Sequence, residues 1–375
     1  MAPKNHDRCR RPLVLLLAAA CTACSRQRSS RPGSRDGNVS GVWRLLVLVA
    51  ACSSSPPVAR STFDPAANLA IASEDVEFAA GANQVPGTLV HPTRHARYPG
   101  IVMMEGSAPA DRDWERVHTG RGIGKQLAEV LAHRGAVVLR FDKAGVGANK
   151  TPLTGQTFDV YRAEGRAALA TLRARTDVDP DKLFVLGHSE GAMHAMRVAL
   201  AEGPPLAGLI MLAGGGRRFG DIQVAQIESQ LHGDVHAQSA PLRAAIEDFI
   251  AGKPADPMLM SVHADNVEVQ RGILSFDPAA AIADVAIPIF IYNGQRDIQI
   301  DPERDAQLLA RRAKAAGRNV TLVLAPQADH VLMHETRSMA ELTGQFWTVV
   351  QHYNDLGRTL DPASIDAIAR WIAAH

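Results

Sequence analysis

The sequence predicts an α/β fold, in which helices cover both faces of a mostly parallel central sheet. From about Glu74 onward, short β-rich runs alternate with runs whose apolar residues recur every three or four positions. This is the pattern of strands joined by crossover helices. One interval, residues 217–285, interrupts the alternation with helix-like sequence alone. It predicts a helical cap inserted into the sheet-forming core.

Eight runs have the composition of strands. Apolar residues dominate the last six, as expected for strands that are buried on both faces. The expected strands are residues 76–79, 87–91, 100–105, 136–142, 182–187, 208–213, 287–293 and 320–325.

Five further runs have the spacing of amphipathic helices that lay an apolar stripe on a sheet. Asp361 precedes the last of them and is expected to cap it, because an aspartate side chain accepts hydrogen bonds from the first amides of a helix. The expected helices are residues 123–134, 161–175, 192–201, 302–316 and 362–374.

The predicted cap contains helix-like stretches near residues 223–231 and 242–250. An insertion after a sheet strand lies at the carboxyl edge of the sheet, where open α/β folds bind ligands. We therefore expect the cap to shape a ligand pocket. The alternative is an ordinary helical excursion that has no part in ligand choice.

The composition is that of a globular protein with 46% hydrophobic and 21% charged residues in a chain of 375. Residues 53–375 contain 31 Lys and Arg against 37 Asp and Glu, which gives a formal charge of −6. Nucleic-acid binding needs clustered Lys and Arg. We therefore expect no nucleic-acid partner.

The first 52 residues differ from the rest, because they hold 9 Lys or Arg against 2 Asp, together with all four cysteines. Apolar runs at residues 12–24 and 45–52 are shorter than the roughly 20 residues that span a bilayer, and they resemble signal-peptide cores. Residues 1–52 are expected to be a leader and residues 53–73 a tether. Residues 74–216 and 286–375 form the expected core around the 217–285 cap.

The second apolar run ends at Ala50-Ala51-Cys52 and is followed by Ser53-Ser54-Ser55-Pro56-Pro57. This resembles a bacterial lipobox with a flexible spacer. Cys52 is then the lipidated residue, synthesis begins near Val42, and the protein is exported to the periplasm or cell envelope with a lipid anchor in the membrane. A plain export signal, or a leader without function, is the alternative.

The strongest motif is Gly187-His188-Ser189-Glu190-Gly191, which lies between the apolar run 183–186 and a helical run from Ala192. G-x-S-x-G between a strand and a helix is typical of a tight turn that lifts a nucleophilic serine above a sheet. Glycines are needed where a side chain would clash. Ser189 is therefore the predicted nucleophile.

A serine hydroxyl needs a histidine to take its proton, and that histidine needs a carboxylate to fix its tautomer. Asp297 and His330 each follow the end of a late predicted strand. They are the predicted acid and base, in the chain order nucleophile, acid, base. Asp301 and His334 are the neighbouring alternatives, and for either aspartate a helix N-cap is the structural alternative.

An oxyanion hole needs two backbone N–H groups. The loop after the third predicted strand, Glu105-Gly106-Ser107-Ala108-Pro109, is expected to supply the Ser107 amide, with Gly106 allowing close approach to the substrate. The Glu190 amide, at the start of the helix after Ser189, is the expected second donor. The alternative is that the loop is merely a turn.

At these motifs the chain resembles the α/β-hydrolase superfamily, and within it esterases and thioesterases related to the bile-acid-CoA acyltransferase type. The resemblance covers residues 74–375. It rests on the loop at residues 106–113, on residues 141–147, on the serine motif and on the Asp297 and His330 loops. It implies an α/β-hydrolase fold and the cleavage of a small-molecule acyl ester or thioester through an acyl-enzyme, without any cofactor.

Three positions depart from that family. The family often has His or a small residue where this chain has Glu105. It often has Gly in place of Ala108 and Arg in place of Ala144. Glu105 is either a pocket carboxylate with a raised pKa or the partner of Arg112 or Arg140 in a structural ion pair. The ion pair is the favoured interpretation.

Other functions have weaker support. Histidines four apart, such as His232 and His236, are too few to predict a metal site, and the glycine runs lack the spacing and lysine of nucleotide-binding loops. The remaining alternatives are a catalytically inactive ligand-binding lipoprotein, a serine peptidase and an acyltransferase of the same fold. No oligomeric state is predicted.

Overall fold

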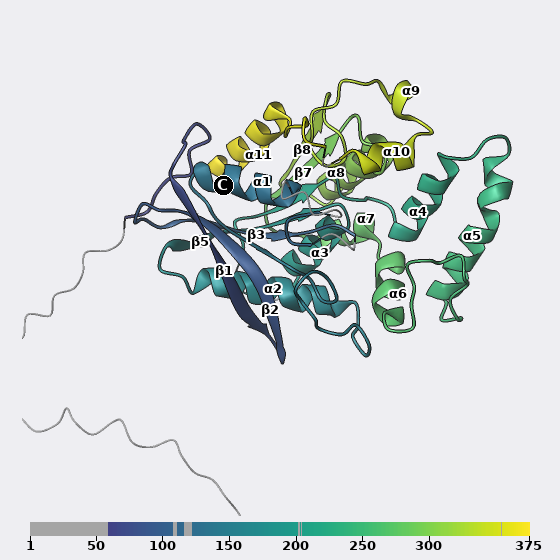
Figure 1. Ribbon diagram of the computed structural model, residues 1–375, viewed down its shortest axis with the longest axis horizontal. Helices are drawn as coiled ribbons and strands as arrows, with labels where there is room; N and C mark the ends of the chain where they lie inside the picture. The colour runs from purple at the N-terminus through teal and green to yellow at the C-terminus, as the bar shows by residue number, and fades with distance from the viewer. Residues whose placement is uncertain (1–58, 108–110, 116–121, 202, 204, 354) are drawn as a thin grey trace, which may run out of the picture. The chain divides into compact units, whose positions relative to one another are not determined.

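The computed structural model describes residues 59–107, 111–115, 122–201, 203, 205–353 and 355–375. An eight-stranded sheet in the order β1-β2-β4-β3-β5-β6-β7-β8 forms its centre (Figure 1). The β1–β2 and β2–β4 pairs are antiparallel, and all the other neighbours are parallel. The strands are β1 (Ile71–Ala80), β2 (Asn83–Pro92), β3 (Tyr98–Met104), β4 (Val137–Phe141), β5 (Val178–His188), β6 (Gly208–Leu212), β7 (Ile289–Gly294) and β8 (Val320–Ala325).

Alternate side chains of the strands divide the core into two layers. On β5, Phe184 and Leu186 pack with α1 and α11, whereas Leu183 and Val185 pack with α2, α3 and α8. Because both faces are covered, the central strands consist of apolar residues without alternation. The helices are α1 (Ile123–His133), α2 (Asp159–Arg173), α3 (Glu190–Ala199), α8 (Gln307–Ala315) and α11 (Pro362–Ala374).

β8 differs from the predicted burial on both faces. Five of its six residues are only half-buried, because β8 is the last strand of the sheet and pairs only with β7. The predicted cap of α11 is confirmed, since the Asp361 side chain accepts the amide of Ser364 at 2.9 Å.

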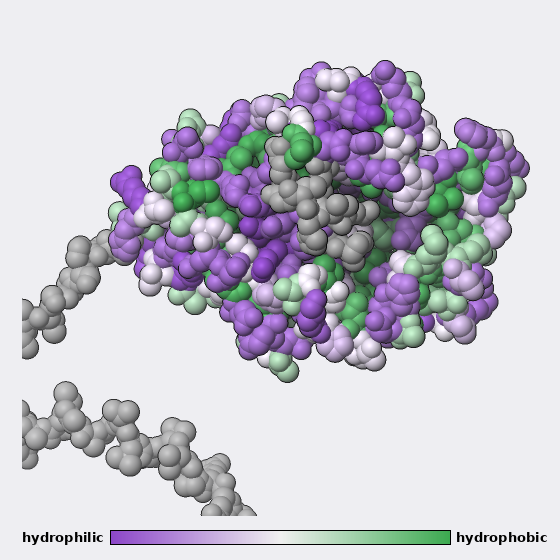
Figure 2. All heavy atoms as spheres, viewed as in Figure 1, coloured by the Kyte–Doolittle hydropathy of each residue, from purple (hydrophilic) through white to green (hydrophobic). Residues whose placement is uncertain are grey.

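Helices alone connect β6 to β7. They are α4 (Phe219–Glu228), α5 (Val235–Ile250), α6 (Val267–Ser275), α7 (Pro278–Ala281) and the short turn η1 (Ile282–Asp284). Val224, Ile246, Phe249 and Leu274 form a small core between α4, α5 and α6. Figure 2 shows hydrophobic residues on the side of these helices that faces the rest of the molecule, and both hydrophilic and hydrophobic residues on their outer side.

The folded core begins earlier than the predicted boundary at residue 74. Arg60 forms a bridge with Arg97, Phe63 is 7% exposed in the main core, and β1 begins at Ile71. The tether predicted for residues 53–73 is therefore wrong for residues 60–73. The predicted leader, including Cys52, lies outside the described residues.

The segment between β8 and α11 contains two short helices that the sequence did not predict, α9 (Met339–Leu342) and α10 (Phe346–Gln351). In the part of the chain that the structure describes, no helix has both the length and the apolar character needed to cross a membrane.

Candidate active site

Ser189 lies at the turn between β5 and α3. Its backbone has φ 55° and ψ −123°, a region that side-chain-bearing residues occupy only under strain. Its amide donates to the carbonyl of Leu212 on β6 at 2.9 Å. The neighbouring strand therefore helps to hold the serine in this conformation.

Gly187 and Gly191 allow the serine turn, residues 187–191, to pack closely. A Cβ at residue 187 would lie 2.1 Å from the carbonyl oxygen of Gly191, and a Cβ at residue 191 would lie 2.3 Å from that of Met104. The obstructing atoms belong to backbone, which cannot swing aside as a side chain can. These contacts explain physically why both positions of the motif are glycine.

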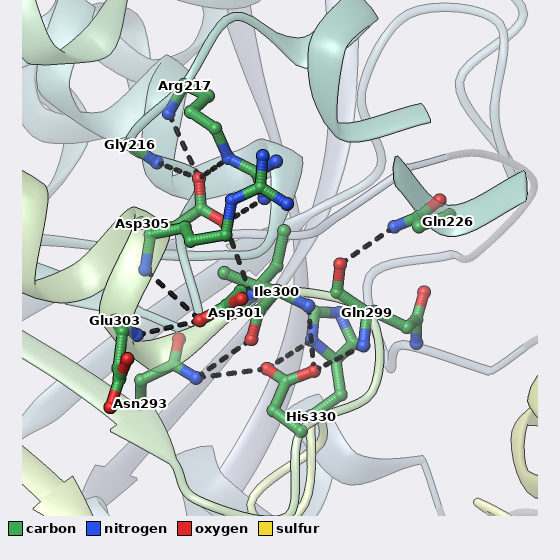
Figure 3. A network of polar contacts seen from close by, with 12 residues as sticks. Gly216, Arg217, Gln226, Asn293, Gln299, Ile300, Asp301, Glu303, Asp305 and His330 are labelled. Carbon is green, nitrogen blue, oxygen red and sulfur yellow. Dashed lines mark hydrogen bonds and ion pairs between the residues drawn. The ribbon is translucent and has the colours of Figure 1, made fainter. Parts of the chain in front are cut away.

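Asp297 and His330 form a buried hydrogen-bonded pair. Nδ1 of His330, which Figure 3 labels, lies 2.9 Å from Oδ2 of Asp297. The other carboxylate oxygen accepts the amides of Gln299 at 2.8 Å and Ile300 at 2.9 Å. The loop thus fixes the carboxylate, and Nε2 is the ring nitrogen left to exchange a proton.

The alternatives to this pair have other roles. The side chain of Asp301 accepts the amides of Glu303 at 2.8 Å and Arg304 at 3.1 Å, which is the N-cap that the sequence allowed for an aspartate here. His334 lies 3.2 Å from Asp361. Among the four candidates, the structure joins Asp297 with His330.

His188 connects the His330 loop to the serine turn. Its Nε2 lies 2.8 Å from the carbonyl oxygen of His330, and the two rings are 4.9 Å apart. Trp114 stacks on His188 at 4.8 Å. Because His188 directly precedes Ser189, these contacts place His330 beside the serine turn. Sequence reasoning did not single out His188, whose contact spans 142 positions.

The loop expected to supply an oxyanion donor runs directly against Ser189. A Cβ on Gly106 would lie 3.1 Å from Cβ of Ser189. Ser107 follows at a half-buried position, and Glu190 is the first residue of α3. The structure therefore places the Ser107 loop against the serine turn and Glu190 within that turn.

A buried lysine that the sequence did not single out lies next to these donors. The ammonium of Lys143 donates to the carbonyl oxygen of Gly106 and lies 3.1 Å from Oε1 of Glu190. Nε2 of His194 lies 3.2 Å from the same oxygen. Burial opposes ionisation of Glu190, but Lys143 and His194 overcome it and hold the pKa of this carboxyl below its usual range.

Glu105 does not form the favoured ion pair. Among the described contacts neither Arg112 nor Arg140 reaches it, and Arg140 pairs with Asp113 instead. One Glu105 oxygen accepts the amide of Lys143 at 3.2 Å. Burial raises the pKa of Glu105 to about 8, and the charge of Lys143 only partly offsets this. The ion-pair interpretation is wrong, and Glu105 is a buried carboxyl with a raised pKa.

Two hollows adjoin these residues. A small pocket is lined by Ser189, Met193, Arg217, Phe219, Ile222 and Ile300, among others. A cavity of about 620 Å³ lies beside Asp297 and includes Arg217, Gln226, Gln299, Arg304, Met339 and Phe346 in its lining. Arg217 lines both, so the two spaces adjoin at this side chain. In the described part of the chain, no group of three or more His, Cys, Asp or Glu side chains is arranged to hold a metal ion.

Arg217 also ties the beginning of the cap to the core. Its guanidinium donates to both oxygens of Asp305, at 3.0 and 2.6 Å (Figure 3). The buried Asp305 carboxylate further accepts the backbone amides of Gly216 and Arg217 at 3.1 and 3.0 Å. This network fixes the chain where it leaves the sheet to form the cap.

A family model described as "Serine aminopeptidase, S33" matches residues 118–337, which is more than half of the chain. The protein belongs to the S33 family of α/β hydrolases. The predicted α/β-hydrolase fold and superfamily are thereby confirmed. The narrower kinship with the bile-acid-CoA acyltransferase type stays a prediction.

The relatives of this S33 hydrolase include one protein named as an esterase. Esterase EstD of Thermotoga maritima is 26% identical over 299 residues, which are 77% of this chain and 66% of that protein. The uncharacterized protein Rv2307c of Mycobacterium tuberculosis is 31% identical over 174 residues, 46% of this chain and 55% of that protein. The S33 hydrolase thus aligns with between about half and two thirds of the length of these relatives.

Solved structures of similar shape include Est1E from Butyrivibrio proteoclasticus with ferulic acid bound. It has 17% sequence identity and a TM-score of 0.49, covering 73% of this chain and 98% of that one.

Proposed function

We propose that this protein is a serine hydrolase that cleaves carboxylic esters with short acyl groups through an acyl-enzyme intermediate. The observation that carries the proposal is the strained Ser189 beside the buried Asp297–His330 pair, with His188 connecting their loops. A histidine that is oriented by a carboxylate and lies within reach of a serine hydroxyl can activate that hydroxyl as a nucleophile. The similarity to a protein named as an esterase supports the ester class.

In the proposed reaction, Oγ of Ser189 attacks the acyl carbonyl carbon while Nε2 of His330 takes the hydroxyl proton. Asp297 stabilises the imidazolium, and the amides of Ser107 and Glu190 hold the oxyanion. Collapse of the tetrahedral intermediate expels the alcohol, which receives the proton from His330. Water, activated by His330, then attacks the acyl-enzyme and releases the acid, restoring the hydroxyl of Ser189.

The size of the pocket at Ser189 favours a short acyl group. Its free volume is about 10 Å³, roughly the space of one water molecule, and Met193, Phe219 and Ile222 contribute apolar walls. As the described residues line this pocket, a long acyl chain fits only if the pocket walls move. The adjoining cavity of about 620 Å³ offers room for the alcohol part of the substrate.

The test is a substrate panel assayed with the purified full chain. It contains 4-nitrophenyl esters from acetyl to dodecanoyl, the matching thioesters, and aminoacyl 4-nitroanilides. We expect turnover to be greatest for the short esters and to disappear in Ser189→Ala, whereas the control Ser61→Ala retains it. Faster cleavage of the anilides would instead identify a peptidase, and faster cleavage of the thioesters would overturn the ester assignment.

A fluorophosphonate probe separates an enzyme from an inactive ligand-binding protein of the same fold. The proposal expects covalent labelling of the wild-type protein and none of Ser189→Ala. Folded wild-type protein that stays unlabelled would overturn the proposed nucleophile.

We further propose that the protein is exported and lipid-anchored through Cys52, as the lipobox-like sequence indicates. Intact-mass analysis of the mature protein tests this. A lipid-modified N-terminal Cys52 would support it, and a mature N-terminus upstream of Cys52 would contradict it.

A further inference from the structure

Lys143 joins a cluster of buried groups beside the serine turn. Its side chain is 4% exposed, and its ammonium contacts the carbonyl oxygen of Gly106, the carboxylate of Glu190 and, at 5.3 Å from the ring centre, the face of Tyr161. Burying an ammonium is costly unless hydrogen bonds and an opposite charge compensate it. Because burying the Lys143 ammonium is costly, we expect it to have a specific role at this place.

The contact with Gly106 fixes the direction of a proposed oxyanion donor. The carbonyl of Gly106 and the N–H of Ser107 belong to one planar trans peptide, so they point in opposite directions. Lys143 holds the carbonyl oxygen, and the N–H must therefore point away from Lys143. Gly106 itself lies against Ser189, which brings this peptide to the place where the oxyanion forms.

The contact with Glu190 fixes the other proposed donor. Glu190 is the first residue of α3, and the first amides of a helix have no acceptor within the helix. Its side chain is held by Lys143 at 3.1 Å and by His194 at 3.2 Å. One ammonium thus joins the two segments that carry the donors, although Gly106 and Glu190 lie far apart in the sequence.

We propose that Lys143 is a positioning residue that sets the oxyanion hole, holding the Gly106–Ser107 peptide by its carbonyl and Glu190 by its carboxylate. The inference rests on the proposed function. A charged donor on the carbonyl also polarises the peptide, which strengthens the Ser107 N–H as a donor to the oxyanion. The simpler alternative is that Lys143 only neutralises the buried Glu190.

Three variants and one control separate these roles. Lys143→Met removes both contacts but leaves the Glu190 charge buried without its partner, which endangers folding. The double variant Lys143→Met/Glu190→Gln removes the charge pair together and leaves the backbone donors in place. Glu190→Gln alone keeps the contact of Lys143 with Gly106. Arg134→Met, which breaks the ion pair with Asp366, is the control for a general loss of stability.

The measurements are kcat, KM and the affinity of an alkyl boronic acid, which forms a tetrahedral adduct on a catalytic serine. In the folded double variant we expect kcat to fall about 10- to 100-fold, less than the loss of a whole oxyanion donor, with KM nearly unchanged. Boronate affinity should fall by the same factor as kcat/KM. Glu190→Gln should lose less than the double variant, and Arg134→Met should keep kcat within about two-fold.

Wild-type kcat and boronate affinity in the folded double variant would overturn the inference. So would a loss confined to KM, because a displaced oxyanion donor acts on the transition state. Failure of the proposed function is distinguishable in the same assay, because Ser189→Ala would then retain the wild-type turnover.

Discussion

At the scale of single residues, the two neighbouring aspartates of the β7 loop have distinct contacts. Asp297 holds His330 at 2.9 Å, whereas Asp301 accepts the amides of Glu303 and Arg304 as an N-cap. Only Asp297 can therefore fix the tautomer of the proposed base. The two positions form a matched pair for mutation.

Asp297→Asn is expected to lower kcat by roughly 10³- to 10⁴-fold, because an amide does not hold the required tautomer or stabilise the imidazolium. Asp301→Asn should change kcat little, since asparagine is also a good N-cap, and Asp301→Ala should cost about 1 kcal/mol of stability. Steady-state kinetics and urea unfolding measure these effects. A larger kcat loss in Asp301→Asn than in Asp297→Asn would assign the acid to Asp301.

Glu105 gives the stability a specific pH dependence. Its pKa is about 8 in the folded protein, against 4.5 ordinarily, with Lys143 and Asp142 as the charged groups that act on it. Between these values the folded state keeps a proton that the unfolded state has lost. The free energy of unfolding therefore falls as the pH rises from about 4.5 to 8.

Glu105→Gln should remove this contribution, because glutamine stays uncharged. We expect the variant to be more stable than the wild type at pH 8, by on the order of a few kcal/mol, and to match it below about pH 4.5. Urea unfolding at several pH values measures the difference. A difference that stays constant across this range would show that Glu105 does not titrate as described.

At the scale of elements, the passage from β5 to α3 depends on backbone packed against backbone. The Cβ of an alanine at residue 191 would lie 2.3 Å from the Met104 oxygen and 2.4 Å from the Glu105 oxygen. Both atoms belong to the end of β3 and the loop that carries Gly106. Any relief of the clash must therefore shift the proposed oxyanion loop.

Gly191→Ala is accordingly expected to cost at least about 3 kcal/mol of stability and to reduce kcat as well. Gly357→Ala is the matched control, because nothing lies within 4 Å of an added Cβ there, and its effect should stay within about 0.5 kcal/mol. Thermal unfolding and ester turnover measure both. Wild-type stability in Gly191→Ala would refute the close packing of the turn.

All eight strands were predictable from sequence because each is a short run rich in apolar or β-branched residues. The half-burial of β8 was not predictable from its sequence. Whether a strand lies at the edge or in the middle of a sheet depends on the strands it pairs with, which its own residues do not reveal. The short helices α9 and α10 (4 and 6 residues) are too short to show a helical period. The early start of the core was missed because Phe63 stands alone among small and polar residues.

The residues of the candidate site were predictable where their position in the chain, just after a predicted strand, indicates their place in the fold. Ser189, Asp297 and His330 each follow the end of a strand, and strand ends could be placed from the apolar runs. Lys143 and His188 were not predictable, because their contacts cross 37 and 142 positions of the chain. For Glu105 the sequence offered both a raised-pKa carboxyl and an ion pair but could not decide between them, since its burial and its contact with Lys143 are properties of the folded protein.

At the scale of the whole molecule, the cap is joined to the core through Arg217 and the buried Asp305. Five donors reach this carboxylate, counting the amides of Gly216, Arg217 and Asp301 and two guanidinium nitrogens of Arg217. Because Arg217 lines both the serine pocket and the larger cavity, this ion pair also shapes the space in which we propose that the substrate binds.

Asp305→Asn should therefore cost roughly 3–5 kcal/mol of stability, as expected when one partner of a buried pair is removed. Glu247→Gln weakens the exposed pair with Arg218 and should cost less than about 1 kcal/mol. Urea unfolding compares the two. Equal losses would show that the Arg217–Asp305 pair contributes no more than a surface contact.

The most direct test of the central claim is to trap the covalent intermediate and locate it. Wild-type protein is mixed with a short acyl ester, quenched in acid within the first turnovers, digested and analysed by mass spectrometry. The account predicts an added mass equal to the acyl group on the peptide that contains Ser189, and none in Ser189→Ala. Turnover with the acyl group attached to a different residue would contradict it.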